Sequence, residues 1–312
     1  MPDIVTLTFS PCIDKSTSVS ALLPEKKLQC TPPKLEPGGG GINVARAVKK
    51  LGGEAVAIFP SGGYTGKHFN HLLALEHIPV VIVECAEETR ENLIVFDESS
   101  KRQYRFGMPV TTLSDEEWRS CFEAIRNLTD IKYIVVSGSL PVMRPKNIFA
   151  ELASIAKDKS AKLVVDTSGD ALQEAANEGV YLLKPNLGEL RTLSQNEINV
   201  IPDAEKAARE LIQRGSCEIV VVSLGKTGAL MVTADEAVHV QSPAVEVKST
   251  VGAGDSMVAG ITYCLVENKS LEETLQFAVA AGTAATLHAG TELCTREDTE
   301  RLFALISETH NR

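Results

Sequence analysis

The chain has no surplus of positive charge and no long apolar run. Its 312 residues include 31 Lys and Arg against 41 Asp and Glu, a formal net charge of −10. Nucleic acids and anionic membranes are bound by broad basic surfaces, so this balance excludes a general affinity for either. No apolar run approaches the ~20 residues of a membrane helix. The first nine residues place no basic region ahead of an apolar stretch, which predicts no secretory signal. We therefore expect a cytoplasmic protein with no nucleic-acid or membrane partner.

Several common site signatures are also missing. The seven cysteines include no C-x-x-C pair. We therefore expect them to be reduced thiols that pack in the core, rather than a framework of disulfides. His68 and His71 stand three residues apart without further ligands, so we assign them to an exposed helical face. Gly225-Lys226-Thr227 lacks the earlier glycine of a Walker A loop, and no G-x-G-x-x-G is present. These absences disfavour a P-loop ATPase and a dinucleotide-dependent dehydrogenase.

What the chain does contain is an alternation of short β-branched runs with helical patterns. The alternation predicts an α/β fold with a doubly wound, mainly parallel sheet flanked by helices, in a single domain over 1–312. We expect strands at 4–9, 54–59, 79–85, 131–137, 161–166, 180–184 and 218–223. We expect helices at 41–51, 65–77, 114–127, 145–157, 169–178, 187–194, 203–214, 254–267 and 271–287.

Two stretches interrupt this rhythm. Residues 14–36 are polar and Pro-rich with an expected strand at 28–35, while 88–107 contain two alternating strands around a Ser-Ser-Lys turn. Neither stretch has a crossover helix nearby, so we expect a small antiparallel β lid. Such a sheet exposes an apolar face and free edges. A substrate lid that pairs with a second subunit, giving a homodimer, would cover them. A hairpin without a function is the alternative.

The stretch "STVGAGDSMVAG" (249–260) places Asp255 between glycines and a predicted helix. The unpaired N–H groups at a helix start bind anions, and glycines let a phosphate approach them. Asp255 is open to two interpretations: a cap of that helix, or a base that accepts the proton of a hydroxyl attacking a phosphate.

Three other segments suit phosphate or hydroxyl binding. The run Gly38–Gly41 leads into a helix whose first turn holds Asn43, an amide suited to sugar hydroxyls, although four glycines also suit a flexible loop. "KPNLGE" (184–189) places Asn186 and Glu189 on one helical face, which fits either a hydrated Mg²⁺ or a capping box. "SLGKTGA" (223–229) ends a strand in a turn that would admit a nucleotide or form a hairpin.

Taken in order, these segments resemble the ribokinase/PfkB sugar kinase family over nearly the whole chain. The glycine run with Asn43 and "STVGAGDSMVAG" look like its two signatures, and "KPNLGE" matches its N-x-x-E element. "TLTFSPCIDKS", "EPGGGGINVARAVKKLGG", "TRENLIVFD", "SGSLP" and "VVDTSGDAL" are similar to the phosphosugar branch. The resemblance implies a ribokinase-like fold, ATP and Mg²⁺ as cofactors, and a phosphorylated ketohexose as substrate.

The resemblance also implies roles for individual residues. Asp255 would be the catalytic base, and the backbone of Gly252, Ala253, Gly254 and Asp255 the anion hole for the transferring phosphoryl group. Asp14, Gly39, Gly40, Asn43 and Ser139 would hold the sugar. Lys184, Asn186 and Glu189 would face the nucleotide phosphates and Mg²⁺, with the metal held by Asn186 and, through water, by Glu189. Ser223, Gly225 and Gly228 would line the nucleotide site.

Arg90 is the candidate for the phosphate already on the sugar, because a guanidinium grips phosphate bidentately. A surface salt bridge with Glu87 or Glu88 is the alternative. Lys27, in the lid, is a second candidate that would reach the sugar phosphate or the nucleotide from either subunit.

The implied reaction is ATP-dependent phosphorylation of fructose 6-phosphate at its C1 hydroxyl. The alternatives are 1-phosphofructokinase and tagatose-6-phosphate kinase activity, a nucleoside kinase, which Arg90 disfavours, and a sugar-phosphate sensor without catalysis, which an intact Asp255 disfavours. The sequence departs from the branch where Pro141 is followed by Val142-Met143 and where Met108-Pro109 is followed by Val110-Thr111. A valine near the expected sugar site changes the shape of the loop and therefore bears on which ketose phosphate fits.

Overall fold

The computed structural model describes residues 2–141, 143–288 and 290–310. Within them a large sheet has the strand order β13-β12-β11-β10-β9-β8-β1-β4-β5. All neighbours from β5 to β11 are parallel, and β12 and β13 add an antiparallel edge. The strands are β1 Ile4–Leu7, β4 Ala55–Ser61, β5 Val80–Glu84, β8 Tyr133–Ser137, β9 Lys162–Asp166, β10 Val180–Leu183, β11 Cys217–Ser223, β12 Ala229–Val232 and β13 Ala237–Val240.

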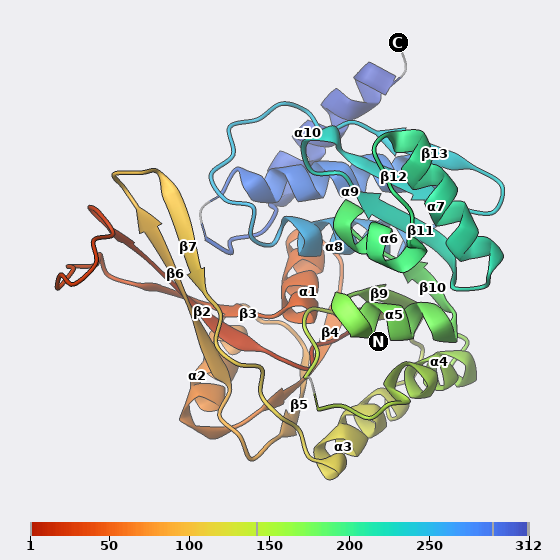
Figure 1. Ribbon diagram of the computed structural model, residues 1–312. Helices are drawn as coiled ribbons and strands as arrows, with labels where there is room; N and C mark the ends of the chain where they lie inside the picture. Colours follow the sequence, from red (N-terminus) through yellow and green to blue (C-terminus); the bar gives the residue numbers. More distant parts are fainter. Residues whose placement is uncertain (1, 142, 289, 311–312) are drawn as a thin grey trace.

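Helices cover both faces of this sheet, as the alternating pattern predicted (Figure 1). They are α1 Gly40–Lys50, α2 Gly63–Leu75, α3 Asp115–Arg126, α4 Ile148–Asp158, α5 Gly169–Glu178, α6 Leu187–Ser194, α7 Ile201–Gln213, α8 Ala253–Val266, α9 Leu271–Thr286 and α10 Arg296–His310. The sequence pattern did not reveal β12, β13 or α10. The other strands expected for this sheet, and the expected helices, are confirmed with small shifts at their ends.

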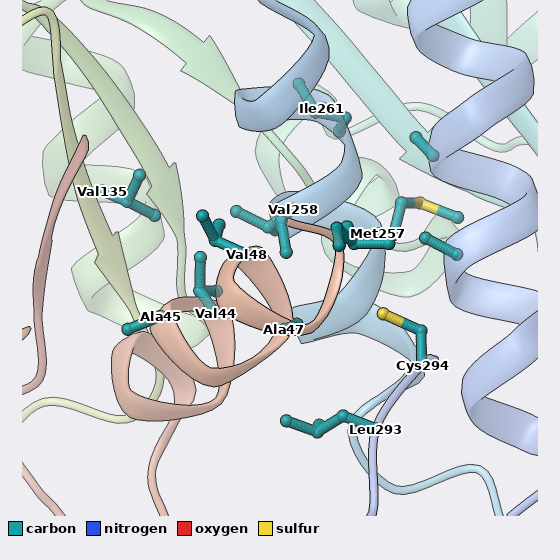
Figure 2. Close-up of a cluster of buried hydrophobic side chains, with 14 of the residues drawn as sticks. Val44, Ala45, Ala47, Val48, Val135, Met257, Val258, Ile261, Leu293 and Cys294 are labelled. Carbon is teal, nitrogen blue, oxygen red and sulfur yellow. The ribbon is translucent and has the colours of Figure 1, made fainter. Parts of the chain in front are cut away.

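The core has two layers because side chains alternate across each strand. In β8, Tyr133 and Val135 pack beneath α1, α2, α8, α9 and α10, while Ile134 and Val136 pack beneath α3 to α7. Figure 2 shows the first layer, where Val44 and Val48 of α1 meet Val258 of α8. This packing places the start of α1 next to the start of α8.

A second, four-stranded sheet with the order β3-β2-β6-β7 projects from the main body (Figure 1). Its strands are β2 Cys12–Val19, β3 Lys34–Gly38, β6 Arg90–Asp97 and β7 Arg102–Phe106. The predicted small sheet is present, and two of its pairings are antiparallel, but β2 and β6 pair in parallel. This sheet, here called the lid, arises from two segments distant in sequence.

One lid strand lies elsewhere than predicted. The expected strand at 28–35 is wrong: only an isolated bridge joins Val19 to Cys30, and the strand begins at Lys34. Pro32 and Pro33 lack backbone N–H groups and fix φ, so the chain cannot form a regular ladder through them. The lid also begins earlier than residue 14, because β2 starts at Cys12.

Candidate active site

The predicted anion-binding turn is the start of α8. Gly252 precedes the helix with φ 75° and ψ 0°, a left-handed conformation that glycine adopts without strain, and no side chain caps the helix. The first N–H groups of α8 are therefore available to a ligand at the positive end of the helix dipole. The opposing surface is close, since a Cβ atom on Gly252 would lie 2.4 Å from Cδ2 of Leu293.

Asp255 lies in the first turn of α8, but it does not cap the helix. Its Oδ2 accepts a hydrogen bond of 2.9 Å from Nδ2 of Asn43, and its Oδ1 accepts one of 3.5 Å from Oγ of Ser137. The capping interpretation of Asp255 is thus wrong. Three elements hold this carboxylate: α1, the end of β8 and α8 itself.

The pKa of Asp255 is raised to about 6. Burial is the main cause, and the nearby Asp166 carboxylate adds to it, while Asn43, Lys184 and Ser137 act in the opposite direction. A carboxylate with this pKa is ionised at neutral pH and accepts a proton more readily than an ordinary aspartate. This is the range in which general bases operate.

Lys184 supplies a buried positive charge beside the same turn. Its side chain follows β10, and its Nζ forms an ion pair of 3.0 Å with Oδ1 of Asp166 at the end of β9. Burial by itself would lower the pKa of Lys184, but Asp166 outweighs it and holds the pKa above its usual value. A Cβ atom on Gly254 would lie 3.5 Å from this Nζ, so the ammonium group adjoins the first turn of α8.

A cavity of about 350 Å³ opens between the lid and these strand ends. Five of the predicted substrate residues line it: Asp14, Gly39, Gly40, Arg90 and Ser139, together with Asp255. Gly40 permits the close approach of α1 to β8, because a Cβ atom there would lie 2.4 Å from the backbone N of Gly138. Asn43 is not a lining residue and contacts the cavity through Asp255.

Arg90 enters the cavity from the first residue of β6. Its Nη1 donates to the carbonyl oxygen of Met108 at 3.0 Å and its Nη2 to that of Ser10 at 3.3 Å. Its Nε is buried and has no acceptor in the part of the chain that the structure describes.

The salt-bridge interpretation of Arg90 is wrong, since the two neighbouring glutamates are engaged elsewhere. Glu88 accepts from the backbone of Tyr64 and Thr65, and Glu87 from that of Thr112. The guanidinium therefore has no carboxylate partner among the described ion pairs.

Lys27 is not brought into the cavity. It lies on the exposed connection between β2 and β3, at the far end of the lid, and is not among the lining residues. Within one copy of the chain it does not meet Arg90. Its predicted role therefore depends on a second subunit.

Asn186 and Glu189 form a capping box at the start of α6. Oδ1 of Asn186 accepts from the N–H of Glu189 at 2.9 Å, and Oε2 of Glu189 accepts from the N–H of Asn186 at 2.8 Å. These bonds leave Oε1 of Glu189 outside the box. Mg²⁺ prefers oxygen ligands and usually keeps several of its bound waters, which is compatible with a carboxylate that contacts it through water. No group of three or more His, Cys, Asp or Glu side chains suited to a metal occurs within residues 2–141, 143–288 and 290–310.

The predicted nucleotide turn forms a hairpin. β11 and β12 pair through a short 3-10 turn at Gly225–Thr227, and Gly228 follows with φ 96°. Ser223 lies beside the capping box, since its N–H donates to the carbonyl oxygen of Pro185 at 3.0 Å. Lys184, Asn186 and Ser223 thus lie at the ends of the neighbouring strands β10 and β11.

Some residues of the site carried no distinct sequence signal. Asn92 and Arg105 line the cavity from lid strands, and Arg105 also donates to Oγ1 of Thr250, just before the predicted anion-binding turn, at 3.1 Å. Asp166 lies in the segment "VVDTSGDAL", but the resemblance implied no role for it. Of the two departures from the family pattern, Val110 does not line the cavity, and Val142 lies outside the described residues.

His68 and His71 are exposed on α2, as expected. None of the described helices combines the length and apolar character needed to span a bilayer.

The chain is similar to known proteins over nearly its whole length. The model of the pfkB family carbohydrate kinases matches residues 7–298. The chain is 47% identical over 308 residues to ATP-dependent 6-phosphofructokinase isozyme 2 of Escherichia coli K12, covering 98% of this chain and 100% of that protein.

Two solved structures are also similar to this chain. The crystal structure of phosphofructokinase-2 from Escherichia coli in complex with fructose-6-phosphate is 45% identical with a TM-score of 0.93, covering 98% of this chain and 100% of that one. Arabidopsis thaliana ribokinase, 20% identical, has a TM-score of 0.76 with 97% of this chain and 98% of that one covered, which confirms the ribokinase-like fold. The chain belongs to the pfkB family of carbohydrate kinases.

Proposed function

We propose that this protein transfers the γ-phosphoryl group of ATP to the C1 hydroxyl of fructose 6-phosphate, giving fructose 1,6-bisphosphate and ADP in the cytoplasm. One observation carries the proposal: a single cavity is lined by the Asp255 carboxylate beside the anion-binding turn and by the Arg90 guanidinium. A sugar phosphate needs both, because one end is an anion and the other a hydroxyl that must lose a proton. The names of the similar proteins support the same substrate.

In this mechanism Arg90 binds the 6-phosphate and orients the sugar, while Asp14, Gly39, Gly40 and Ser139 bind its hydroxyls. Asp255 accepts the proton of the C1 hydroxyl while the oxygen of that hydroxyl bonds to the γ-phosphorus. The bond from the γ-phosphorus to the bridging oxygen breaks, and the electron pair leaves with ADP. Positioning and charge neutralisation provide most of the catalysis in phosphoryl transfer.

The transferring group would lie against the N–H groups of Gly252, Ala253, Gly254 and Asp255, with the Lys184 ammonium beside them. Donors already in place stabilise charge as it develops, at no cost of reorganisation. The strand ends at Asn186, Glu189, Ser223, Gly225 and Gly228 would bind the nucleotide. Mg²⁺ bound with ATP would neutralise phosphate charge, held by Asn186 and, through water, by Glu189.

The test is a coupled assay of ADP release with Mg-ATP, comparing kcat/KM for fructose 6-phosphate, tagatose 6-phosphate, fructose 1-phosphate and fructose. Preference for fructose 6-phosphate is the expected result. Preference for tagatose 6-phosphate or fructose 1-phosphate keeps the mechanism and overturns the substrate. No turnover with any sugar, together with retained binding of a sugar phosphate, favours a sensor.

We also propose that residues 1–312 act as one catalytic domain and form a homodimer through the lid, the segments of about 14–36 and 88–107. The lid exposes apolar side chains, with Leu23 53%, Tyr104 38% and Phe106 44% accessible, and its outer strands β3 and β7 have open edges. Such surfaces are normally covered. In the dimer, Lys27 of one subunit would reach the phosphates bound by the other.

A mixing experiment tests this arrangement. Asp255→Asn and Lys27→Ala homodimers, each weakly active, should regain activity when subunits are exchanged, because a mixed dimer then contains one complete site. Mixing without recovery would show that Lys27 acts within its own subunit or not at all. Sedimentation of Leu23→Asp and Tyr104→Asp variants, expected to be monomeric, tests the interface itself.

A further inference from the structure

Asn92 occupies a central place in the cavity wall. β2 and β6 pair in parallel, with Asp14 opposite Asn92 and Cys12 opposite Arg90. Nδ2 of Asn92 donates to Oδ1 of Asp14 at 3.0 Å and to Sγ of Cys12 at 3.2 Å. Oδ1 of Asn92 accepts from the backbone N–H of Met108 at 3.1 Å. Both ends of the amide are therefore engaged by the protein.

Chemistry allows only one orientation of this amide. A backbone N–H can only donate, so it must face the amide oxygen. The carboxylate oxygen of Asp14 accepts a hydrogen bond, so it faces the amide nitrogen. Asn92 is thus a fixed connector and does not depend on a ligand to complete its hydrogen bonds.

The connection continues to Arg90. The carbonyl oxygen of Met108 accepts from Nη1 of Arg90 at 3.0 Å, so the N–H and the C=O of Met108 are held by Asn92 and Arg90 respectively. A continuous path of hydrogen bonds leads from the Asp14 carboxylate through Asn92 and Met108 to the Arg90 guanidinium. The two ends of this path line the same cavity.

We infer that Asn92 is a positioning residue that sets the Asp14 carboxylate relative to the Arg90 guanidinium, and so matches the cavity to a sugar carrying a hydroxyl and a phosphate at a fixed separation. The inference rests on the proposed function, in which Asp14 binds a sugar hydroxyl and Arg90 the sugar phosphate. Asn92 acts through these two side chains, since its own amide is already occupied.

The variant Asn92→Asp tests this with almost no change in volume. One oxygen of the introduced carboxylate can still accept from the N–H of Met108. The other oxygen faces the carboxylate of Asp14, where the Asn92 amide donated a hydrogen bond. Like charges at this distance repel, and a shared proton relieves the repulsion. We expect the KM for fructose 6-phosphate to rise by ~10-fold or more at pH 8, with the KM for ATP and kcat changed by less than about threefold, because a lost hydrogen bond to a charged group has roughly this effect.

The pH dependence separates positioning from a general structural defect. Acid favours a proton shared between the introduced carboxylate and Asp14, so the KM of the variant should fall toward the wild-type value as the pH is lowered from 8 to 6. The charged and titratable groups around this point are Cys12 and Asp14 on β2, Arg90 on β6, Arg105 on β7 and Asp255 on α8. Asp255, with a pKa of about 6, titrates in the same window, so the variant is compared with wild type at each pH.

Glu91→Gln is the matched control. Glu91 is the adjacent residue of β6, pairs with Lys15 of β2 at 3.0 Å and does not line the cavity. The Glu91→Gln variant loses a charged contact between the same two strands, and it should keep the wild-type KM at both pH values. An Asn92→Asp enzyme whose KM equals that of wild type at pH 8 would overturn the inference, as would a raised KM that does not respond to pH.

Wild-type turnover is measured first, which separates the two proposals. If wild type prefers another ketose phosphate, the KM values of Asn92→Asp and wild type are compared with that sugar. The same two outcomes then support or overturn the role of Asn92. If wild type neither turns over nor binds any sugar phosphate by calorimetry, the proposed function fails and the inference fails with it. The contact itself is checked without substrate: the melting temperature of Asn92→Asp should fall relative to wild type as the pH rises from 5 to 8, because the folded pair binds a proton that the unfolded chain releases.

Discussion

Asn43 on α1 and Asp255 on α8 meet at 2.9 Å, amide nitrogen to carboxylate oxygen, across 212 positions of sequence. The buried Arg46 fixes which end of the amide faces Asp255. Its Nη1 lies 3.4 Å from Oδ1 of Asn43, and a guanidinium offers only donors, so the amide oxygen must turn toward it. The packing of two helix starts thereby delivers an N–H donor to the proposed catalytic base.

Replacing Asp255 with Asn should abolish the proposed proton transfer and leave the start of α8 in place. We expect kcat to fall by ~10²–10⁴, the usual contribution of a general base. The affinity for ATP, measured by calorimetry, should change little, because Lys184 and the N–H groups of α8 remain. Near-normal turnover of Asp255→Asn would remove Asp255 from the mechanism.

The pH dependence of the wild-type enzyme follows from the raised pKa of Asp255. The base must be ionised to accept a proton, so kcat should fall as the pH drops through about 6. An aspartate with an ordinary pKa near 3.8 would place this limb about two units lower. A kcat that stays constant down to pH 5 would contradict the assignment, provided that circular dichroism shows the protein still folded there.

Asn43→Ala should move this acidic limb to higher pH. The hydrogen bond from Asn43 stabilises the ionised carboxylate, and its loss leaves burial and Asp166 to raise the pKa of Asp255 further. kcat is measured from pH 5 to 8.5 at saturating sugar, since Asn43 is also a proposed sugar ligand. A limb that does not move would show that this contact has no influence on the base.

Asp166→Asn should move the same limb in the opposite direction. The Asp166 carboxylate is the second cause of the raised pKa of Asp255, and its removal also leaves the Lys184 ammonium without its partner at 3.0 Å. Both effects favour the ionised form of Asp255, so kcat should persist to lower pH. Shifts of Asn43→Ala and Asp166→Asn in one common direction would be incompatible with this electrostatic account.

The sequence predicted β1, β4, β8, β9, β10 and β11 well because these strands are mostly buried and appear as short apolar runs. It also located six of the residues that line the cavity, and four of these, Gly39, Gly40, Ser139 and Asp255, follow a strand end or a glycine turn. It failed where tertiary contacts decide. Nothing local indicates that Asn92 lies opposite Asp14, and the pattern at 28–35 did not account for the effect of Pro32 and Pro33.

The same limit explains two ambiguous motifs. The N-x-x-E of Asn186 and Glu189 fitted a metal site and a capping box equally, and only the positions of their backbone N–H groups show that the box is formed. For Arg90, the choice between a salt bridge and a free guanidinium depended on where Glu87 and Glu88 point. Their partners, Thr112, Tyr64 and Thr65, lie 23 to 25 residues away from them in sequence.

Gly252→Ala tests whether the anion-binding turn must be preorganised. An alanine at φ 75° carries a strain of about 1–3 kcal/mol, and its Cβ would meet Cδ2 of Leu293 at 2.4 Å. Gly215→Ala is the control, because Gly215 has φ 83° and no atom within 4 Å of an added Cβ. Urea unfolding should show a loss of stability in both variants. Only Gly252→Ala should also lower kcat, by ~10-fold or more, since displaced N–H donors no longer meet the transferring phosphoryl group. Equal kcat values in the two variants would mean that the start of α8 does not bind that group.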